Sequence, residues 1–177
     1  DSRWIAVGQE KQGMVFVHDL GTGEEVLRFD CPFVPFRLAF NPAGDQLAVA
    51  GSGLEVRAVN TGNLIRQLKA PAPVWDVTWD ADGWRRVTAC GMEIYIWDAN
   101  SGRQLGVLRG HQATVTGARF NRYGDVLLSS AWDGTSRLWD AATERQLLSM
   151  PNCFNHESDW EAKGLTGGSG PSLRLWE

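Results

Sequence analysis

The sequence predicts an all-β protein made of repeated antiparallel sheets. Three observations support this prediction: segments in which apolar and polar residues alternate, turn sequences between them, and recurrence of both with a period near 40 residues. Alternation is typical of half-buried strands, and four short antiparallel strands in a row form one blade of a β-propeller. The expected fold class is therefore a β-propeller of four-stranded antiparallel blades.

The clearest repeat unit runs from Gly110 to Met150. Its first expected strand is Val115–Phe120, and the turn NRYGD leads into a second strand, Val126–Ala131. The tight turn WDG leads into a third strand, Thr135–Asp140, and Arg145–Met150 supplies the fourth. The unit thus contains every element of one blade.

The other units are recognised by their turns. The turn after the first strand recurs around Gly44, Gly83 and Gly124, which are 39 and 41 residues apart. The polar residue that closes the third strand recurs at similar intervals, as Asp19, Asn60, Asp98, Asp140 and Glu177. This register indicates a single segment, 1–177, with blade units at about 1–30 (partial), 33–69, 73–108, 110–150 and 151–177 (partial).

The two ends of the chain overlap in the phase of the repeat. DSRWIAVG near the start resembles ESDWEAKG near the end, so Trp4 and Trp160 occupy corresponding positions. Because both ends carry the same strands, joining them would leave duplicates. We therefore expect about three full blades plus two partial ones, in an open arc rather than a closed ring, as part of a larger protein.

Three features of the unit 110–150 resemble the WD-repeat family: the GH at Gly110 and His111, the DGT turn at Asp133, and the RLWD ending at Asp140. The resemblance covers nearly the whole chain in its period, but only this unit carries the full pattern. The sequence is also similar in style to bacterial WD-repeat proteins, some of which carry their propeller behind a serine/threonine kinase.

This resemblance implies a structural hydrogen-bond chain in blade 110–150, formed by His111, Ser129, Asp133 and Trp139. The third unit keeps Thr88 and Trp97 but has Ala70 at the histidine position, and Val59 and His18 replace the tryptophan in the second and first units. We expect those three blades to depend on apolar packing and to be individually weaker.

Composition argues against several functions. The 17 Lys and Arg residues and 21 Asp and Glu residues give a net charge of -4 without a basic stripe, which argues against nucleic acid as a partner. No apolar run reaches the roughly 18 residues that span a bilayer, so no membrane partner is expected. Cys31, Cys90 and Cys153 are odd in number and far apart, which favours free thiols in a reducing, cytoplasmic compartment.

Candidate chemical motifs have structural interpretations. The Ser, His and Asp of the fourth unit lack a nucleophile elbow, so no catalytic residue is predicted. GTGEE at 21–25 joins two expected strands and is interpreted as a hairpin turn rather than a phosphate loop. His156, Glu157 and Asp159 are interpreted as solvated surface rather than a metal site. We expect no cofactor, no metal and no enzyme activity.

The rims of the propeller are the expected binding surfaces, because neighbouring blades bury the strand faces. The resemblance implies that partners dock on the rim with the tight turn of Asp133, which places Trp132, Trp75, Phe36 and Thr116 nearby. For Phe36 and Trp75 the alternative is packing between blades, whereas Trp132 lies in a tight turn with little core to enter.

The predicted function is a protein–protein interaction scaffold that binds other proteins or peptides. Its expected context is the regulatory or sensing part of a larger bacterial signalling protein, with further blades or domains in the same chain. Two alternatives remain open: a propeller enzyme, hydrolase or oxidoreductase, with a site in the central channel, and a purely structural spacer.

Overall fold

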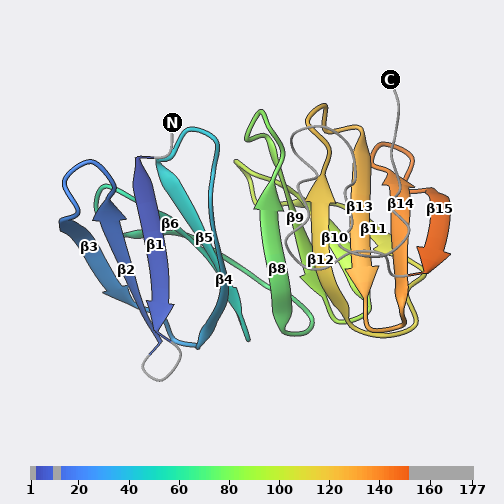
Figure 1. Cartoon of the computed structure of the whole chain (residues 1–177), viewed down its shortest axis with the longest axis horizontal. Helices are drawn as coiled ribbons and strands as arrows, with labels where there is room; N and C mark the ends of the chain where they lie inside the picture. Colours follow the sequence, from blue (N-terminus) through green and yellow to red (C-terminus); the bar gives the residue numbers. More distant parts are fainter. Residues whose placement is uncertain (1–2, 10–12, 152–177) are drawn as a thin grey trace.

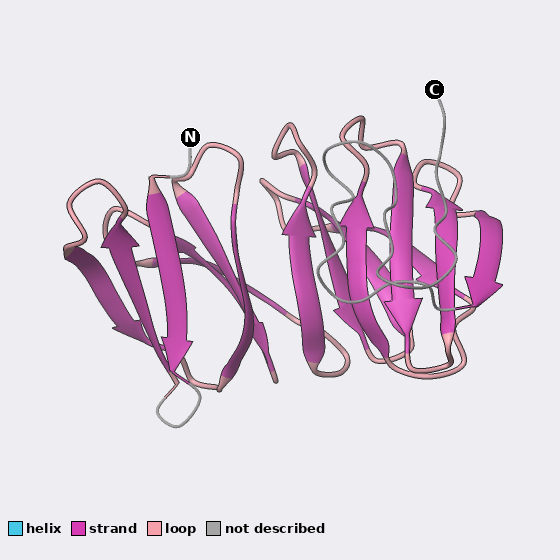
Figure 2. Ribbon diagram, in the orientation of Figure 1, coloured by secondary structure: helices cyan, strands magenta, loops and turns pink. Residues whose placement is uncertain are grey.

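The computed structural model describes residues 3–9 and 13–151, and these residues form fifteen strands and no helix (Figures 1 and 2). Consecutive strands pair antiparallel in four sheets, named blades 1 to 4 in chain order. Blade 1 contains β1 (Trp4–Gln9), β2 (Met14–Asp19) and β3 (Glu25–Asp30). Blade 2 contains β4 (Pro35–Phe40), β5 (Gln46–Gly51), β6 (Leu54–Ala58) and β7 (Leu64–Leu68). Blade 3 contains β8 (Val74–Trp79), β9 (Arg85–Cys90), β10 (Glu93–Asp98) and β11 (Gln104–Arg109), and blade 4 contains β12 (Val115–Phe120), β13 (Val126–Ala131), β14 (Thr135–Asp140) and β15 (Gln146–Pro151).

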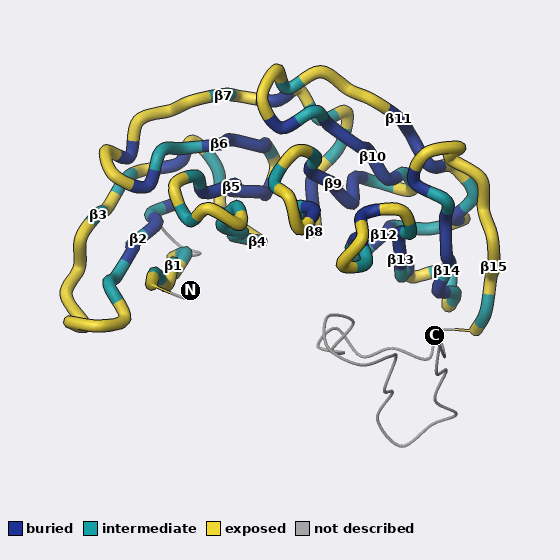
Figure 3. Tube along the Cα trace, turned by 90° about the horizontal axis from the view of Figure 1, so that it is seen from above, coloured by how far each residue is buried: buried dark blue, intermediate teal, exposed yellow. Residues whose placement is uncertain are grey.

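The four blades form an open arc. Figure 3 shows β1, β4, β8 and β12 along the inner side of the arc and β3, β7, β11 and β15 along its outer side. The described residues do not close a ring, and three of the four sheets have four strands. The predicted fold class is confirmed: the described residues form an open, partial propeller of antiparallel blades. The fifth unit expected at 151–177 lies, apart from Pro151, outside the described residues, and so does Trp160.

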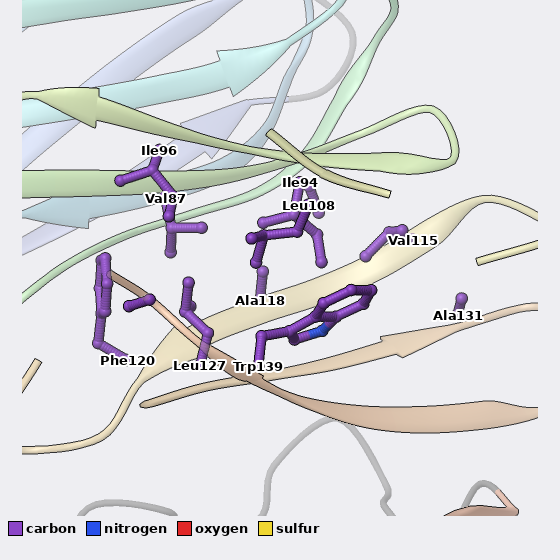
Figure 4. Packing of buried hydrophobic residues seen from close by; sticks show 12 residues of the cluster. Val87, Ile94, Ile96, Leu108, Val115, Ala118, Phe120, Leu127, Ala131 and Trp139 are labelled. Carbon is purple, nitrogen blue, oxygen red and sulfur yellow. The ribbon is translucent and has the colours of Figure 1, made fainter. Parts of the chain in front are cut away.

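Apolar side chains fill the three spaces between neighbouring blades. Between blades 3 and 4, for example, Leu108 and Ile94 of blade 3 pack near Trp139 and Leu127 of blade 4 (Figure 4). Equivalent clusters join blades 2 and 3 and blades 1 and 2. The middle strands β5 and β9 are almost fully buried, whereas the outer strand β15 is mostly exposed. Each blade is therefore stabilised chiefly by its neighbours, as in other repeat proteins.

Equivalent turns impose the period of the sequence. Gly44, Gly83 and Gly124 follow the first strand of blades 2, 3 and 4 and have φ values of 72°, 74° and 72°. This left-handed conformation favours glycine. The side chain of Asn121 accepts hydrogen bonds from the backbone N–H groups of Asp125 and Val126, which fixes the turn. The recurring glycine therefore marks one backbone conformation repeated once per blade. The described residues contain no helix long and apolar enough to cross a membrane.

Candidate protein-interaction surface

Blade 4 contains a buried chain of hydrogen bonds. Trp139 Nε1 donates to Ser129 Oγ at 2.8 Å, and Ser129 Oγ lies 2.8 Å from His111 Nε2. On the other side of the ring, His111 Nδ1 lies 2.9 Å from Asp133 Oδ2. With the histidine hydrogen on Nδ1, each polar group in the chain has a partner. The four residues named from the sequence are thus brought together by β13, β14 and the turns beside them.

The protonation states of this chain follow from burial. Burial lowers the pKa of His111 below 6.5, and this effect outweighs the opposing effect of the hydrogen bond that His111 donates to Asp133. For Asp133, burial raises the pKa, but hydrogen bonds from Gln112 N–H, Thr135 and His111 outweigh it and hold the pKa far below its usual range. A neutral imidazole and an ionised carboxylate therefore coexist at neutral pH.

The hydroxyl of Ser129 is enclosed rather than available to a substrate. Ser129 is 1% exposed, and its oxygen accepts the indole N–H of Trp139. A nucleophile needs a free path to a reacting atom, which this position lacks. We therefore assign a structural role to this row of hydrogen bonds. The four residues that form it, His111, Ser129, Asp133 and Trp139, are named here the blade-4 lock.

Blade 3 holds only part of the same arrangement. Trp97 Nε1 donates to Thr88 Oγ1 at 2.9 Å, and both side chains are buried. At the histidine position, Ala70 packs against the apolar cluster between blades 2 and 3. In blade 2, Val59 at the tryptophan position is also buried in an apolar cluster. Apolar contacts thus occupy the places of the missing polar groups in these two blades.

A β-bulge interrupts the first strand of blades 2, 3 and 4. In β4 the pairing with β5 passes from Pro35 to Arg37, which leaves Phe36 out of the ladder. The same skip leaves out Trp75 in β8 and Thr116 in β12. A bulged residue is re-aimed relative to the strand faces, so its side chain escapes the space between blades. The bulge explains how large aromatic residues in inner strands reach the rim.

Three aromatic rings meet at that rim. The rings of Phe36 and Trp75 are stacked with centroids 5.2 Å apart, and the rings of Trp75 and Trp132 meet edge to face at 5.3 Å. The exposed fractions are 47% for Phe36, 37% for Trp75 and 65% for Trp132. Three blades therefore contribute one ring each to a continuous surface, which is named here the aromatic ridge (Phe36, Trp75 and Trp132).

The fourth residue named from the sequence, Thr116, makes a local hydrogen bond. Its hydroxyl donates to the backbone oxygen of Ser130 at 3.3 Å, and the residue is partly buried. The alternative for Phe36 and Trp75, packing between blades, describes part of their position, because the two rings stack across blades 2 and 3. They do so at the rim, where both rings stay partly exposed. Two further exposed apolar residues at this rim, Val34 and Met92, were not anticipated from the sequence.

A buried carboxylate under the ridge joins three blades. Asp76, next to Trp75, is 3% exposed, and its Oδ2 accepts the backbone N–H of Ala118 in blade 4 at 3.2 Å. Arg37, next to Phe36, places Nε 3.1 Å from Asp76 Oδ1, an ion pair outside hydrogen-bonding geometry. The contacts link the strands that carry the ridge. Sequence reasoning missed Arg37 and Asp76, because a pair formed between two blades leaves no local signal in the sequence.

The remaining candidate chemistry is limited. Cys31 and Cys90 are free and buried, and burial raises the pKa of Cys31 to about 11. Cys153, His156, Glu157 and Asp159 lie outside the described residues. Within the described part, no three His, Cys, Asp or Glu side chains are grouped to hold a metal ion. Residues 21–24 lie in the turn between the antiparallel strands β2 and β3, and Glu25 begins β3, as expected for a hairpin.

Comparison with known families and proteins places this geometry in context. Residues 102–140 match the family described as WD domain, G-beta repeat. The matched segment runs from the end of the β10–β11 turn to the end of β14 and contains the whole blade-4 lock. The match and the repeated antiparallel blades together support a WD-repeat propeller.

Individual relatives match over part of their length. Periodic tryptophan protein 2 homolog of Mus musculus is 48% identical over 48 residues, which is 27% of this chain and 5% of that protein. Nuclear distribution protein nudF of Aspergillus niger is 29% identical over 153 residues, 79% of this chain and 34% of that protein. Eukaryotic translation initiation factor 3 subunit I of Bombyx mori is 34% identical over 80 residues, 40% of this chain and 23% of that protein. The matched part thus spans about a third or less of each relative. These relatives are eukaryotic, so the similarity to bacterial WD-repeat proteins stays a prediction.

Proposed function

We propose that this chain is a protein–protein interaction scaffold whose docking site is the aromatic ridge. Two of the related proteins are named as subunits of larger assemblies, eukaryotic translation initiation factor 3 subunit I and THO complex subunit 6 homolog. Their names support a scaffold role here, with other proteins or peptides as the partners.

The observation that carries the proposal is the meeting of three half-exposed rings from three blades. Aromatic residues bury a large area at small entropic cost and are enriched among the residues that dominate binding energy. Complete burial of a large apolar side chain contributes roughly 1.5 to 3 kcal/mol. Trp132 contributes the most exposed ring, so it is the expected anchor of the interaction.

A pull-down with three forms of the chain tests the proposal. Each of three forms is immobilised on a resin and incubated with a lysate of the source organism: the wild type, Trp132→Ala and the control Trp84→Ala. The bound proteins are then quantified by mass spectrometry. Trp84 is 70% exposed in the β8–β9 turn, at the other end of the blades, so it matches Trp132 in type and exposure. Partners lost about tenfold with Trp132→Ala but retained with Trp84→Ala support the proposal. Identical profiles for all three forms contradict it.

We further propose the cellular setting predicted from the sequence. The chain is the regulatory or sensing part of a larger cytoplasmic signalling protein of a bacterium, with further blades or domains in the same polypeptide. The proposal of further blades or domains is supported by the relatives, which this sequence matches over only part of their length. The reading frame on both sides of this sequence in its source genome tests the setting. A kinase or further WD repeats in the same frame support it, and a eukaryotic source contradicts its bacterial part.

A further inference from the structure

The two ends of the blades carry different amounts of charge. The aromatic ridge lies at the end with the β5–β6, β9–β10 and β13–β14 turns, the lower rim in Figure 1. This end is named here the apolar rim, and it comprises residues 31–36, 52–53, 70–75, 91–92, 110–116 and 132–134. The opposite end has seven turns among the described residues, 19–24, 41–45, 59–63, 80–84, 98–103, 121–125 and 140–145. Six of those seven contain Asp or Glu.

Within the described segments of the apolar rim, no exposed side chain carries a formal charge. The segments that form it contain two ionisable side chains other than buried thiols, His111 and Asp133, and both are buried in the blade-4 lock. Of the charged residues that directly adjoin these segments, Asp30, Lys69, Glu93 and Arg109 lie on the outer half of the blades. The other two, Arg37 and Asp76, lie in the inner strands β4 and β8 and pair with each other. Among the described residues, the exposed side chains of the rim are therefore apolar or neutral.

The charge beneath the ridge is also compensated. The guanidinium of Arg37 faces the carboxylate of Asp76 at 3.1 Å, and Asp76 in turn accepts a backbone N–H from blade 4. The side chain of Arg37 is 40% exposed, but its charge is already paired with Asp76. A charged group of a partner that docked here would therefore lose its water and gain only a share in an existing ion pair. Desolvating an ion without a partner costs several kcal/mol, which is more than the contact of one aromatic ring returns.

The loops beside the ridge are stiff. Pro32 and Pro35 precede Phe36 in sequence, and Pro71 and Pro73 precede Trp75. Proline fixes φ and limits the conformations that a free loop can explore. A rigid surface loses little entropy when it binds, so apolar burial is available for affinity. The rim is thus organised for contact before a partner arrives.

From these observations, and resting on the proposed function, we infer that the partner of the ridge is an uncharged apolar segment of another protein. The contacting stretch is rich in Leu, Pro or aromatic residues and lacks Lys, Arg, Asp and Glu. The association is driven by burial of apolar surface, so it changes little with ionic strength.

A random peptide display library tests the chemistry of the partner. The whole chain is immobilised, bound peptides are sequenced, and the most enriched peptide is synthesised with a fluorescent label. We expect charged residues to be depleted at least threefold relative to the starting library. By fluorescence anisotropy, the Kd should change less than twofold between about 0.05 and 0.5 M NaCl. It should rise at least tenfold with Trp132→Ala and stay unchanged with Trp84→Ala.

Other outcomes separate this inference from the proposed function. Charged peptides with salt-dependent binding that still requires Trp132 overturn the inference and leave the docking role of the ridge intact. Peptides that bind Trp132→Ala as well as the wild type contradict both. No enrichment of any peptide overturns the inference, and the pull-down then decides the proposed function alone. Dimers that form in sedimentation velocity only when Trp132 is present would identify a second copy of this chain as the partner of the ridge. That result would also overturn the inference.

Discussion

The blade-4 lock and the aromatic ridge use neighbouring residues of one turn in opposite ways. Asp133 is directed inward, where its side chain is 7% exposed and contacts His111, whereas Trp132 is directed outward and is 65% exposed. The lock satisfies buried polar groups, which contributes to stability, and the ridge leaves apolar surface exposed, which costs stability unless a partner covers it. If the ridge is the docking site proposed above, stability and recognition should be separable by substitutions only a few residues apart.

The largest expected loss of stability comes from the lock. Trp139→Ala removes an indole that is 1% exposed in the cluster between blades 3 and 4 and leaves the Ser129 hydroxyl without its donor. We expect a loss of about 3 to 5 kcal/mol in the free energy of unfolding, measured by urea denaturation. Trp139→Phe, which keeps most of the apolar volume, is the control and should cost less. A loss below about 1 kcal/mol for Trp139→Ala would show that blade 4 does not depend on the lock.

Asp76→Ala is expected to change both the stability of the fold and the aromatic ridge. It removes the acceptor of Ala118 N–H and the partner of Arg37, and we expect a loss of about 1 to 3 kcal/mol in unfolding free energy. Because Asp76 joins the strands that carry the rings, the near-ultraviolet circular dichroism of the Trp75–Trp132 pair should also change. Asp45→Ala, in a turn at the opposite rim, is a control. An unchanged near-ultraviolet spectrum would show that Asp76 does not position the rings of the ridge.

A smaller effect is expected from pH. The folded pKa of His111 lies below its unfolded value of 6.5, so the unfolded chain binds the extra proton more readily. Stability is therefore full above pH 6.5 and falls as pH decreases through the folded pKa. Asp133, whose folded pKa is also lowered, adds a similar loss at more acid pH. His111→Asn should show a shallower decline of Tm between about pH 6.5 and 5 than the wild type. Equal slopes would assign the pH dependence to other groups.

The fold could be predicted from the sequence because the same turn conformation is repeated in successive blades. Gly44, Gly83 and Gly124 mark the same turn in three blades, and spacing alone reveals the period. The members of the lock were identified by the resemblance of blade 4 to the WD-repeat family, and the need of buried polar groups for partners agrees with that assignment.

The ridge was only partly predictable. Its residues were placed near one rim, but their mutual contact depends on the β-bulges and on the distance between neighbouring inner strands, neither of which a single strand sequence encodes. Arg37 and Asp76 gave no sequence signal of pairing, since they are 39 residues apart and interact only because β4 and β8 lie in adjacent blades. Such contacts between repeats are set by packing rather than by local pattern.

The central claim is that the ridge binds a partner and contributes little to folding, and Trp132→Ala tests it most directly. The unfolding free energy and the affinity for a captured partner or selected peptide are measured on the same preparation. Because the Trp132 side chain is 65% exposed, we predict a stability change within about 0.5 kcal/mol and an affinity loss of at least tenfold. A loss of stability above about 2 kcal/mol with unchanged affinity would contradict the claim and assign Trp132 to the fold.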